Sequence, residues 1–307
     1  MSFRKEKYLG FTESILSPQT DFVGSSSNED IRSLFRETLD GGVHGFCFSI
    51  YEEGQKPGDI ISAEQVRKRM QILKPYAAWV RSFSCVEGNE LVPKIAKEMG
   101  IKCLVGAWLG SDKEKNRVEV DNLISLAKEG YVDIAVVGNE VLYRKDLTED
   151  ELLDYIEEVK NAIPAGIPVG YVDAYYEFVQ RQRITEACDI ILCNCYPYWE
   201  GTDFDHSLQH MQHMYNQATM AANGKKVIIT ETGWPSKGES LGDAVPSELN
   251  AMTYFINTQK WAKADNIEVF YFSSFDESWK VGAEGVVGAY WGIWDKTEQL
   301  KFNNEHI

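Results

Sequence analysis

The chain has 307 residues, of which 44% are hydrophobic, 12% aromatic and 25% charged, and this composition excludes a disordered or collagen-like protein. Its formal net charge of −16 opposes binding to nucleic acid or to an anionic membrane, because both need clustered Lys and Arg. We therefore expect a globular protein whose partner is neutral or cationic.

Signals for targeting and for metal binding are missing from the sequence. No run approaches the roughly 18 apolar residues of a membrane span, and the opening MSFRKEK leads into no apolar signal core. As written, the chain is expected to be cytoplasmic, although a secreted or periplasmic protein with its signal removed would look the same. The six cysteines lie mostly in apolar runs without zinc-ligand spacing, so we expect reduced thiols and no metal site. We also expect a monomer.

The chain begins with residues 1–40, which we expect to form an N-terminal extension packed on the main domain, with a capped helix at 28–39. From residue 41 to 307, strand-like apolar runs alternate with stretches of helical periodicity. The predicted strands cover residues 45–50, 77–83, 102–107, 132–137, 168–172, 190–194, 226–230 and 268–272. The predicted helices cover residues 63–73, 91–99, 118–127, 151–162, 208–221 and 248–262.

Strict alternation of strands and helices predicts a parallel sheet of the α/β class. Eight strands at about 30 residues per unit match a (β/α)8 barrel, that is, a TIM barrel, formed by one domain over residues 41–307. The doubly wound open sheet is the structural alternative, but neither a Gly-x-Gly-x-x-Gly after the first strand nor a Walker A motif is present. Residues 200–224 hold a short loop and one helix, which leaves no space for an inserted subdomain.

Two predicted strands end in a glutamate. Glu231 lies near the end of the apolar run in 227–238 (VIITETGWPSKG), and Glu140 ends residues 132–140 (VDIAVVGNE). In a barrel the strand ends share one rim, so these carboxylates can face each other across a bound substrate. Such a pair suits glycoside hydrolysis, which needs one protonated acid and one ionised nucleophile or base. The alternative is that each glutamate caps a strand or joins an ion pair.

The segment 227–238 resembles the signature of glycoside hydrolase family 17, the β-1,3-glucanases and related glucanosyltransferases. The resemblance runs from about residue 45 to residue 294. It includes the segments 51–57 (YEEGQKP), 80–83 (VRSF), 137–140 (VGNE), 194–198 (NCYPY) and 275–280 (FDESWK). The resemblance implies a retaining double displacement with Glu231 as the nucleophile and Glu140 as the general acid/base, with the two carboxyl groups about 5 to 5.5 Å apart.

Further site residues follow from the same resemblance. Asn139 precedes the acid, as in the larger clan of barrel hydrolases, and its amide is expected to hold the sugar 2-hydroxyl. Glu277 and Lys280 match positions that bias the protonation of the pair, the alternative being a surface ion pair. The remaining substrate-binding candidates are Tyr51, Tyr196, Tyr198 and Trp279. Trp234, in the Gly-Trp-Pro turn, is interpreted as structural.

Three histidines, His206, His210 and His213, recur at i, i+4 and i+7 on one predicted helix. That helix is expected on the outside of the barrel, away from the carboxylates, so a solvated or packed face is preferred over a metal site.

The expected function is cofactor-independent, retaining hydrolysis of β-1,3-glucan such as laminarin, or of its oligosaccharides. A β-1,3-glucanosyltransferase using the same glutamates remains open, because water and an acceptor hydroxyl compete for one covalent intermediate. A non-catalytic glucan-binding barrel is disfavoured, because both acids are present. The chain departs from the family pattern at Ser273, Ser274 and Ser278, and the missing subdomain resembles microbial members and not plant members.

Overall fold

Residues 21–302 are described by the computed structural model, so the first half of the predicted N-terminal extension lies outside the described residues. The described chain forms a closed barrel of eight parallel strands in sequential order, with β8 paired to β1. The strands are β1 Val43–Cys47, β2 Ala77–Ser82, β3 Lys102–Ala107, β4 Ile134–Asn139, β5 Val169–Ala174, β6 Ile191–Asn194, β7 Val227–Thr232 and β8 Val269–Tyr271. The predicted (β/α)8 barrel is confirmed.

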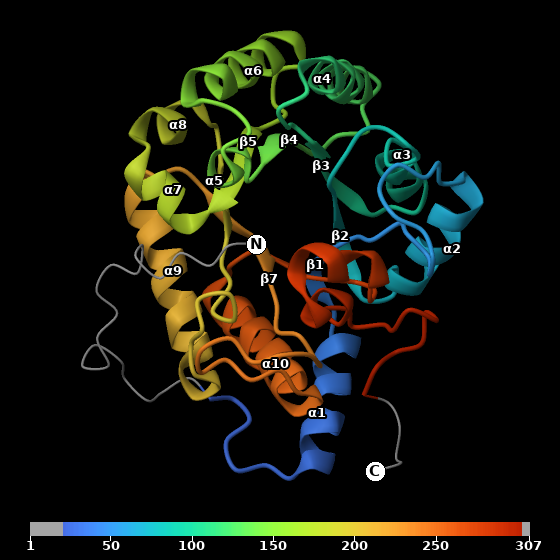
Figure 1. The fold of residues 1–307 in the computed structure, drawn as a ribbon, viewed down its shortest axis with the longest axis vertical. Helices are drawn as coiled ribbons and strands as arrows, with labels where there is room; N and C mark the ends of the chain where they lie inside the picture. The colour runs from blue at the N-terminus through green and yellow to red at the C-terminus, as the bar shows by residue number, and fades with distance from the viewer. Residues whose placement is uncertain (1–20, 303–307) are drawn as a thin grey trace.

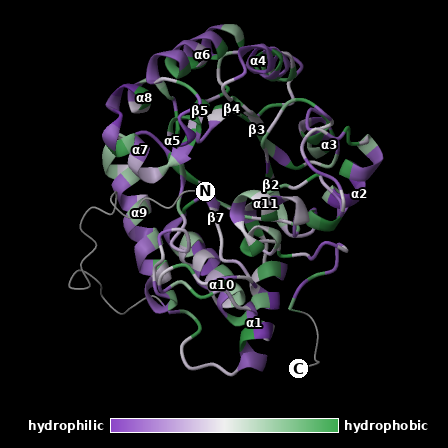
Figure 2. Cartoon of the chain, viewed as in Figure 1, coloured by the Kyte–Doolittle hydropathy of each residue, from purple (hydrophilic) through white to green (hydrophobic). Residues whose placement is uncertain are grey.

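Helices surround the strands (Figure 1). The α-helices are α1 Asn28–Asp40, α2 Ala63–Leu73, α3 Leu91–Glu98, α4 Lys113–Lys128, α5 Val141–Arg144, α6 Glu149–Ala162, α7 Tyr175–Gln180, α8 Gln182–Ala187, α9 Ser207–Ala221, α10 Glu248–Asp265 and α11 Val281–Glu284. Short 3-10 helices are η3 Phe204–His206, η4 Ser278–Lys280 and η5 Val286–Ala289. Hydrophilic and hydrophobic residues alternate around the outer helices, as expected for amphipathic helices that cover a barrel (Figure 2).

Helix α1 precedes the first strand and packs beside α10 (Figure 1). It begins with a capping box in which the Ser27 side chain and the Asp30 side chain satisfy each other's backbone amides. Its apolar face buries Ile31, Phe35 and Leu39, and the ring of Phe35 lies 5.2 Å from that of Phe255 on α10. The helix therefore belongs to the same hydrophobic core as the outer ring of the barrel.

The connection between β5 and β6 differs from the prediction. It contains two helices of six residues each, α7 and α8, that meet at Arg181. Six residues are fewer than two helical turns, too few for an apolar periodicity to be recognised in the sequence. The connection between β6 and β7 holds only η3 and α9, as predicted for a chain without the inserted subdomain.

The six cysteines are all buried and all free. They sit on or beside the strands, where a thiol packs as a small apolar group. Within residues 21–302, no helix combines the length and the apolar character needed to cross a bilayer.

Candidate active site

Glu140 follows the last residue of β4 and is held in the left-handed region of backbone space, with φ 52° and ψ 28°. Its amide donates to the carbonyl of Val172 on β5 at 2.8 Å, which extends the sheet pairing by one residue. The side chain is buried, and its Oε1 accepts a hydrogen bond from Nδ2 of Asn194 on β6 at 3.0 Å. Asn194 in turn accepts from the hydroxyl of Thr230 at 2.9 Å, so the amide that meets Glu140 has a fixed orientation.

Glu231 lies inside β7, and the strand register shifts beside it on both neighbouring strands. Both carboxylate oxygens are occupied. Nη1 of Arg81 on β2 lies 2.5 Å from Oε1, and the hydroxyl of Tyr196 donates to Oε2 at 2.8 Å. The second guanidinium nitrogen of Arg81 donates to Oδ1 of Asn139 at 2.7 Å. Arg81 therefore joins Glu231 to the residue that directly precedes Glu140.

The two glutamates have different electrostatic environments. Burial and, to a smaller extent, the nearby Glu231 raise the pKa of Glu140 to about 7, although Asn194 and two arginines act in the opposite direction. Glu231 instead forms a buried ion pair with Arg81, whose side chain is 1% exposed. At neutral pH the site can therefore present one proton donor and one carboxylate, the division of roles that acid/base chemistry requires.

A second buried cluster follows β8. Oε1 of Glu277 accepts hydrogen bonds from the Ser49 hydroxyl at 2.5 Å and from the Trp279 indole at 3.0 Å. Its Oε2 lies 2.5 Å from Nζ of Lys280. Burial alone would lower the pKa of Lys280, but Glu277, with smaller contributions from Glu284 and Glu231, raises it overall. Glu277 and Lys280 are thus a buried pair, with Lys280 within electrostatic reach of Glu231, and not the surface ion pair that was the alternative.

These observations can be compared with known proteins. A family model described as the BtgE/BtgC glycoside hydrolase domain matches residues 45–292, which begin inside β1 and extend past the cluster after β8. The chain belongs to glycoside hydrolase family 17.

Several curated and solved relatives are similar to this family 17 member. A glucan 1,3-beta-glucosidase of Saccharomyces cerevisiae is 27% identical over 272 residues, which cover 80% of this chain and 86% of that protein. The glucan 1,3-beta-glucosidase BGL2 of Candida albicans is 27% identical over 260 residues, 76% of this chain and 84% of that protein. An active-site mutant of Rhizomucor miehei beta-1,3-glucanosyltransferase, solved with laminaritriose, superposes with a TM-score of 0.77 at 29% identity, covering 85% of this chain and 96% of that one.

The three candidate tyrosines of this hydrolase have different surroundings. Tyr196 contacts Glu231 directly, as described above. Tyr51 is half-buried, with its ring 5.9 Å from that of Trp279 in an edge-on contact. The hydroxyl of Tyr198 donates to the carbonyl of Glu239 at 2.6 Å, and its ring packs among buried indoles. Its contacts stabilise a rim loop and give no support to a role for Tyr198 in binding substrate.

The tryptophans near the rim divide by exposure. Trp234 is buried, and its indole donates to the carbonyl of Val245 at 3.0 Å, which agrees with the structural interpretation of the Gly-Trp-Pro turn. Trp291 is also buried, whereas Trp199 and Trp279 are half-buried. Trp108, which follows β3, is 41% exposed. Trp108, Trp199 and Trp279 therefore keep part of their surface open to solvent, with the Arg144 guanidinium 4.6 Å from the ring centre of Trp108.

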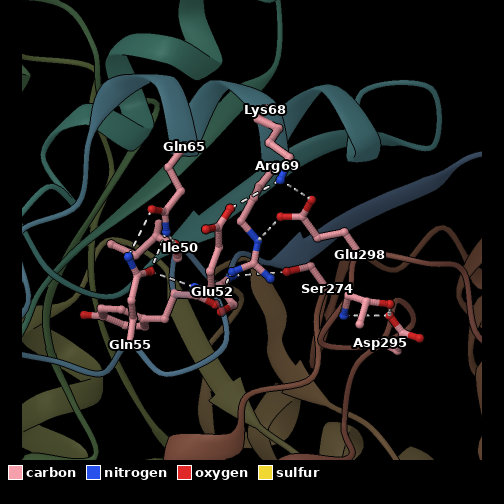
Figure 3. Close-up of polar contacts among 12 residues, drawn as sticks. Ile50, Glu52, Gln55, Gln65, Lys68, Arg69, Ser274, Asp295 and Glu298 are labelled. Carbon is pink, nitrogen blue, oxygen red and sulfur yellow. Dashed lines mark hydrogen bonds and ion pairs between the residues drawn. The ribbon is translucent and has the colours of Figure 1, made fainter.

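The loop that carries Tyr51 is anchored by α2 (Figure 3). The buried guanidinium of Arg69 donates to the carbonyl of Tyr51 and lies 3.9 Å from the ring centre of Phe275. Its Nε is 3.6 Å from the carboxylate of Glu298, close to the end of the described chain. Gln65 of the same helix donates to the carbonyl of Ile50 at 2.7 Å. Helix α2 thus links the first rim loop to the segments after β8.

Two residues of the glutamate pair's surroundings, Arg81 and Asn194, were missed as site residues by sequence reasoning. Both stand inside segments that carry the family resemblance, 80–83 and 194–198. The available signal was a cation or an amide within an apolar strand, because a buried polar group requires a partner. Arg81 is buried and pairs with Glu231, and Asn194 is buried and pairs with Glu140.

The histidines on α9 lie apart from the glutamates. Nε2 of the buried His210 lies 2.5 Å from a carboxylate oxygen of Glu200, and its ring stacks on that of His213 at 6.3 Å. This is the packed face that the sequence predicted. In the described part of the chain, no group of three or more His, Cys, Asp or Glu side chains is arranged to hold a metal ion.

Proposed function

We propose that this family 17 enzyme hydrolyses β-1,3-glucan, such as laminarin or its oligosaccharides, with retention of configuration. The observation that carries the proposal is the contrast between two buried glutamates at one rim. The pKa of Glu140 is raised to about 7, whereas Glu231 is a carboxylate paired with Arg81 and Tyr196. The substrate class is supported by relatives that are named glucan 1,3-beta-glucosidases and by the similar transferase solved with laminaritriose.

In the first step, protonated Glu140 gives its proton to the glycosidic oxygen while Glu231 attacks the anomeric carbon. The carbon to oxygen bond of the leaving sugar breaks as the bond to Glu231 forms. In the second step, Glu140 is a carboxylate and removes a proton from water. The oxygen of that water displaces Glu231 from the anomeric carbon, which returns both side chains to their starting states.

Asn139 is the proposed ligand of the sugar 2-hydroxyl. Its side-chain oxygen is already bonded to Arg81 at 2.7 Å, so the amide cannot flip freely. An amide with its oxygen occupied offers its NH2 group, which donates hydrogen bonds. Asn139 therefore serves as a donor to a sugar hydroxyl, a contact that stabilises the transition state of glycoside hydrolysis.

The two roles are tested by replacement. Glu231→Ala removes the nucleophile and is expected to lower laminarin hydrolysis by at least about a thousandfold. Glu140→Gln is expected to lower kcat/KM for natural glucan by roughly 10²–10⁴-fold, but much less for a nitrophenyl laminarioside, because kcat/KM reports formation of the covalent intermediate and this leaving group needs little acid help. The matched control is Glu119→Gln, which replaces another buried glutamate that bonds to Ser84 and Cys85. Full laminarin activity in Glu231→Ala would refute the proposal.

Transfer to a second sugar is a further candidate, favoured by the similarity to the beta-1,3-glucanosyltransferase of Rhizomucor miehei. The two reactions share the covalent intermediate and differ only in the acceptor. Incubation with a defined laminari-oligosaccharide at high concentration distinguishes them by product size. Products longer than the starting sugar indicate transfer, and products that are only shorter indicate hydrolysis.

A further inference from the structure

The backbone at Glu140 has a left-handed conformation that residues other than glycine rarely adopt. Glu140 has a φ of 52° and is followed directly by α5, a helix of only four residues. The residue after this helix, Lys145, is also left-handed. Such a conformation costs about 1–3 kcal/mol and persists only where the surroundings impose it. The contacts that impose it here come largely from β5, the neighbouring strand.

Two side chains of β5 hold the amides that follow Glu140. The hydroxyl of Tyr171 accepts from the amide of Leu142 at 3.0 Å and donates its own proton to Asp173. Asp173 also accepts from the amide of Tyr143 at 3.3 Å and from that of Ala174 at 2.7 Å. Tyr171 and Asp173 are both fully buried, so no solvent competes for these bonds.

Tyr171 and Asp173 are two residues apart and share one face of β5. The ring of Tyr171 lies 6.2 Å from that of Phe178 on α7, which identifies this face as the one covered by helices. In Figure 1, β5, α5 and α7 occupy one sector of the barrel. The pair therefore supports the turn from outside the barrel and does not line the rim where a sugar would bind.

Charged and titratable groups surround this pair. Burial raises the pKa of Asp173 well above its usual value, and the nearby Glu140 and Glu177 raise it further. Glu177 is engaged by Arg181 at 2.6 Å, and Tyr176 also faces Asp173. From the opposite side, Glu140 faces Glu231, Asn194, Arg144 and Arg81. The buried carboxyl group of Asp173 accepts hydrogen bonds from three donors on two adjacent segments. This arrangement is suited to holding the backbone of those segments in place.

We propose that Tyr171 and Asp173 are positioning residues that aim Glu140. By holding the amides of Leu142 and Tyr143, they keep Glu140 in its left-handed conformation, with its carboxyl group directed toward Asn194 and the reaction centre. The inference rests on the proposed role of Glu140 as general acid. A displacement of about 1 Å in a reacting group can cost a hundredfold in rate, so a small movement of this turn is sufficient to be measured.

The test is Tyr171→Phe, which removes one hydroxyl and keeps the ring. We expect kcat/KM for laminari-oligosaccharides to fall about 10- to 100-fold and kcat/KM for a nitrophenyl laminarioside to fall less than about threefold, because kcat/KM reports the step in which Glu140 is the acid and only the natural leaving group needs a well-aimed acid. The matched control is Tyr254→Phe, which loses a buried hydroxyl bond of 2.6 Å to Thr232 on another part of the barrel. The control should keep the wild-type ratio of the two rates.

Glu140→Gln is measured beside these variants so that the two proposals can fail separately. If Glu140→Gln discriminates between the substrates but Tyr171→Phe lowers both rates equally, or neither, the positioning inference is wrong and the acid role stands. If Glu140→Gln does not discriminate, the acid role itself fails. Should Tyr171→Phe not fold, as judged by its circular dichroism, Asp173→Asn replaces it with the same expected change in the ratio.

Discussion

Glu140 and Glu231 show how neighbouring residues can give one type of side chain two opposite states. Both are buried, and burial by itself favours the neutral form of a carboxyl group. They differ in their partners: the Arg81 guanidinium forms an ion pair with Glu231, whereas Glu140 receives a hydrogen bond from the neutral amide of Asn194. Arg81 also acts to lower the pKa of Glu140, but burial and Glu231 outweigh it. Glu140 is therefore the glutamate whose pKa is raised.

The raised pKa of Glu140 predicts a pH-dependent contribution to stability. The folded-state pKa of about 7 exceeds the ordinary glutamate value of 4.5, so the contribution is fully present below about pH 4.5 and is lost as pH rises through 7. Glu140→Gln cannot ionise. Relative to the parent chain, it should therefore gain up to ~3 kcal/mol in the free energy of unfolding between pH 4.5 and pH 8. Urea denaturation of both chains at pH 4.5 and pH 8 measures this gain, and an equal difference at both values would contradict it.

The sequence could predict the two glutamates because each ends an apolar run, a pattern that can be recognised without knowledge of three-dimensional contacts. The assignment of the acid role to Glu140 came from the family resemblance, because the ion pair that distinguishes Glu231 joins it to Arg81, 150 positions away in the sequence. Tyr198 illustrates a different limit of the sequence. It lies two residues from Tyr196 in a matching segment, yet its hydroxyl bonds to Glu239 and not to a glutamate of the pair. Tyr196 and Tyr198 are close in sequence but have different partners, because the chain leaves the strand and enters a loop at this point.

At the scale of elements, the strands were predictable and the irregularities between them were not. The predicted strand 102–107 matches β3, because one continuous apolar run spans the strand. The bulges beside Glu231 have no sequence signal, since a register shift depends on both partners of a strand pair. The predicted strand 132–137 is displaced to Ile134–Asn139, because pairing with β5 continues to the end of the segment. Hydrophobic pattern locates strands, while cross-strand contacts set their ends.

The end of β7 depends on a glycine. Gly233 lies two residues after Glu231, and a Cβ placed on it would meet the carbonyl oxygen of Phe272 at 2.0 Å. Gly233→Ala must therefore push β7 and β8 apart, with an expected loss of roughly 2–4 kcal/mol in the free energy of unfolding. A drop in glucanase activity should accompany this loss, because Glu231 moves with the strand.

The control for this prediction is Gly282→Ala in α11, where an added Cβ meets no atom within 4 Å. It should leave stability within about 0.5 kcal/mol of the parent chain. Thermal unfolding and laminarin hydrolysis of both variants provide the measurements. Equal behaviour of the two alanine variants would show that the close approach at Gly233 is unimportant.

At the scale of the whole molecule, the protein carries a large negative charge, whereas the proposed substrate carries none. The formal net charge is −16, whereas a β-glucan is neutral. Part of the charge is paired between outer helices, as in Arg117 with Glu158 at 2.7 Å and Lys113 with Glu151 at 2.8 Å. Exposed pairs of this kind contribute little to stability, because solvent screens them. The field around the molecule is therefore predominantly negative and has no attraction for a neutral sugar.

Ionic strength should accordingly discriminate between neutral and charged glucans. For laminari-oligosaccharides, we expect KM to change less than about twofold between roughly 20 and 500 mM salt, because mobile ions screen exposed charges and not the buried pair of Arg81 and Glu231. For a carboxymethylated β-1,3-glucan, KM should fall as salt screens the repulsion. A strong salt dependence of KM with the neutral sugar would indicate that surface charge takes part in binding.

Because all six thiols are buried, the folded chain should be unreactive toward reagents that modify thiolates. Burial raises the pKa of Cys47 on β1 to about 12, and it raises that of Cys103 on β3 as well. Alkylation of these side chains therefore requires the barrel to open. Because the cysteines lie on strands from β1 to β6, the rate at which each one is labelled would report how often its own part of the sheet separates.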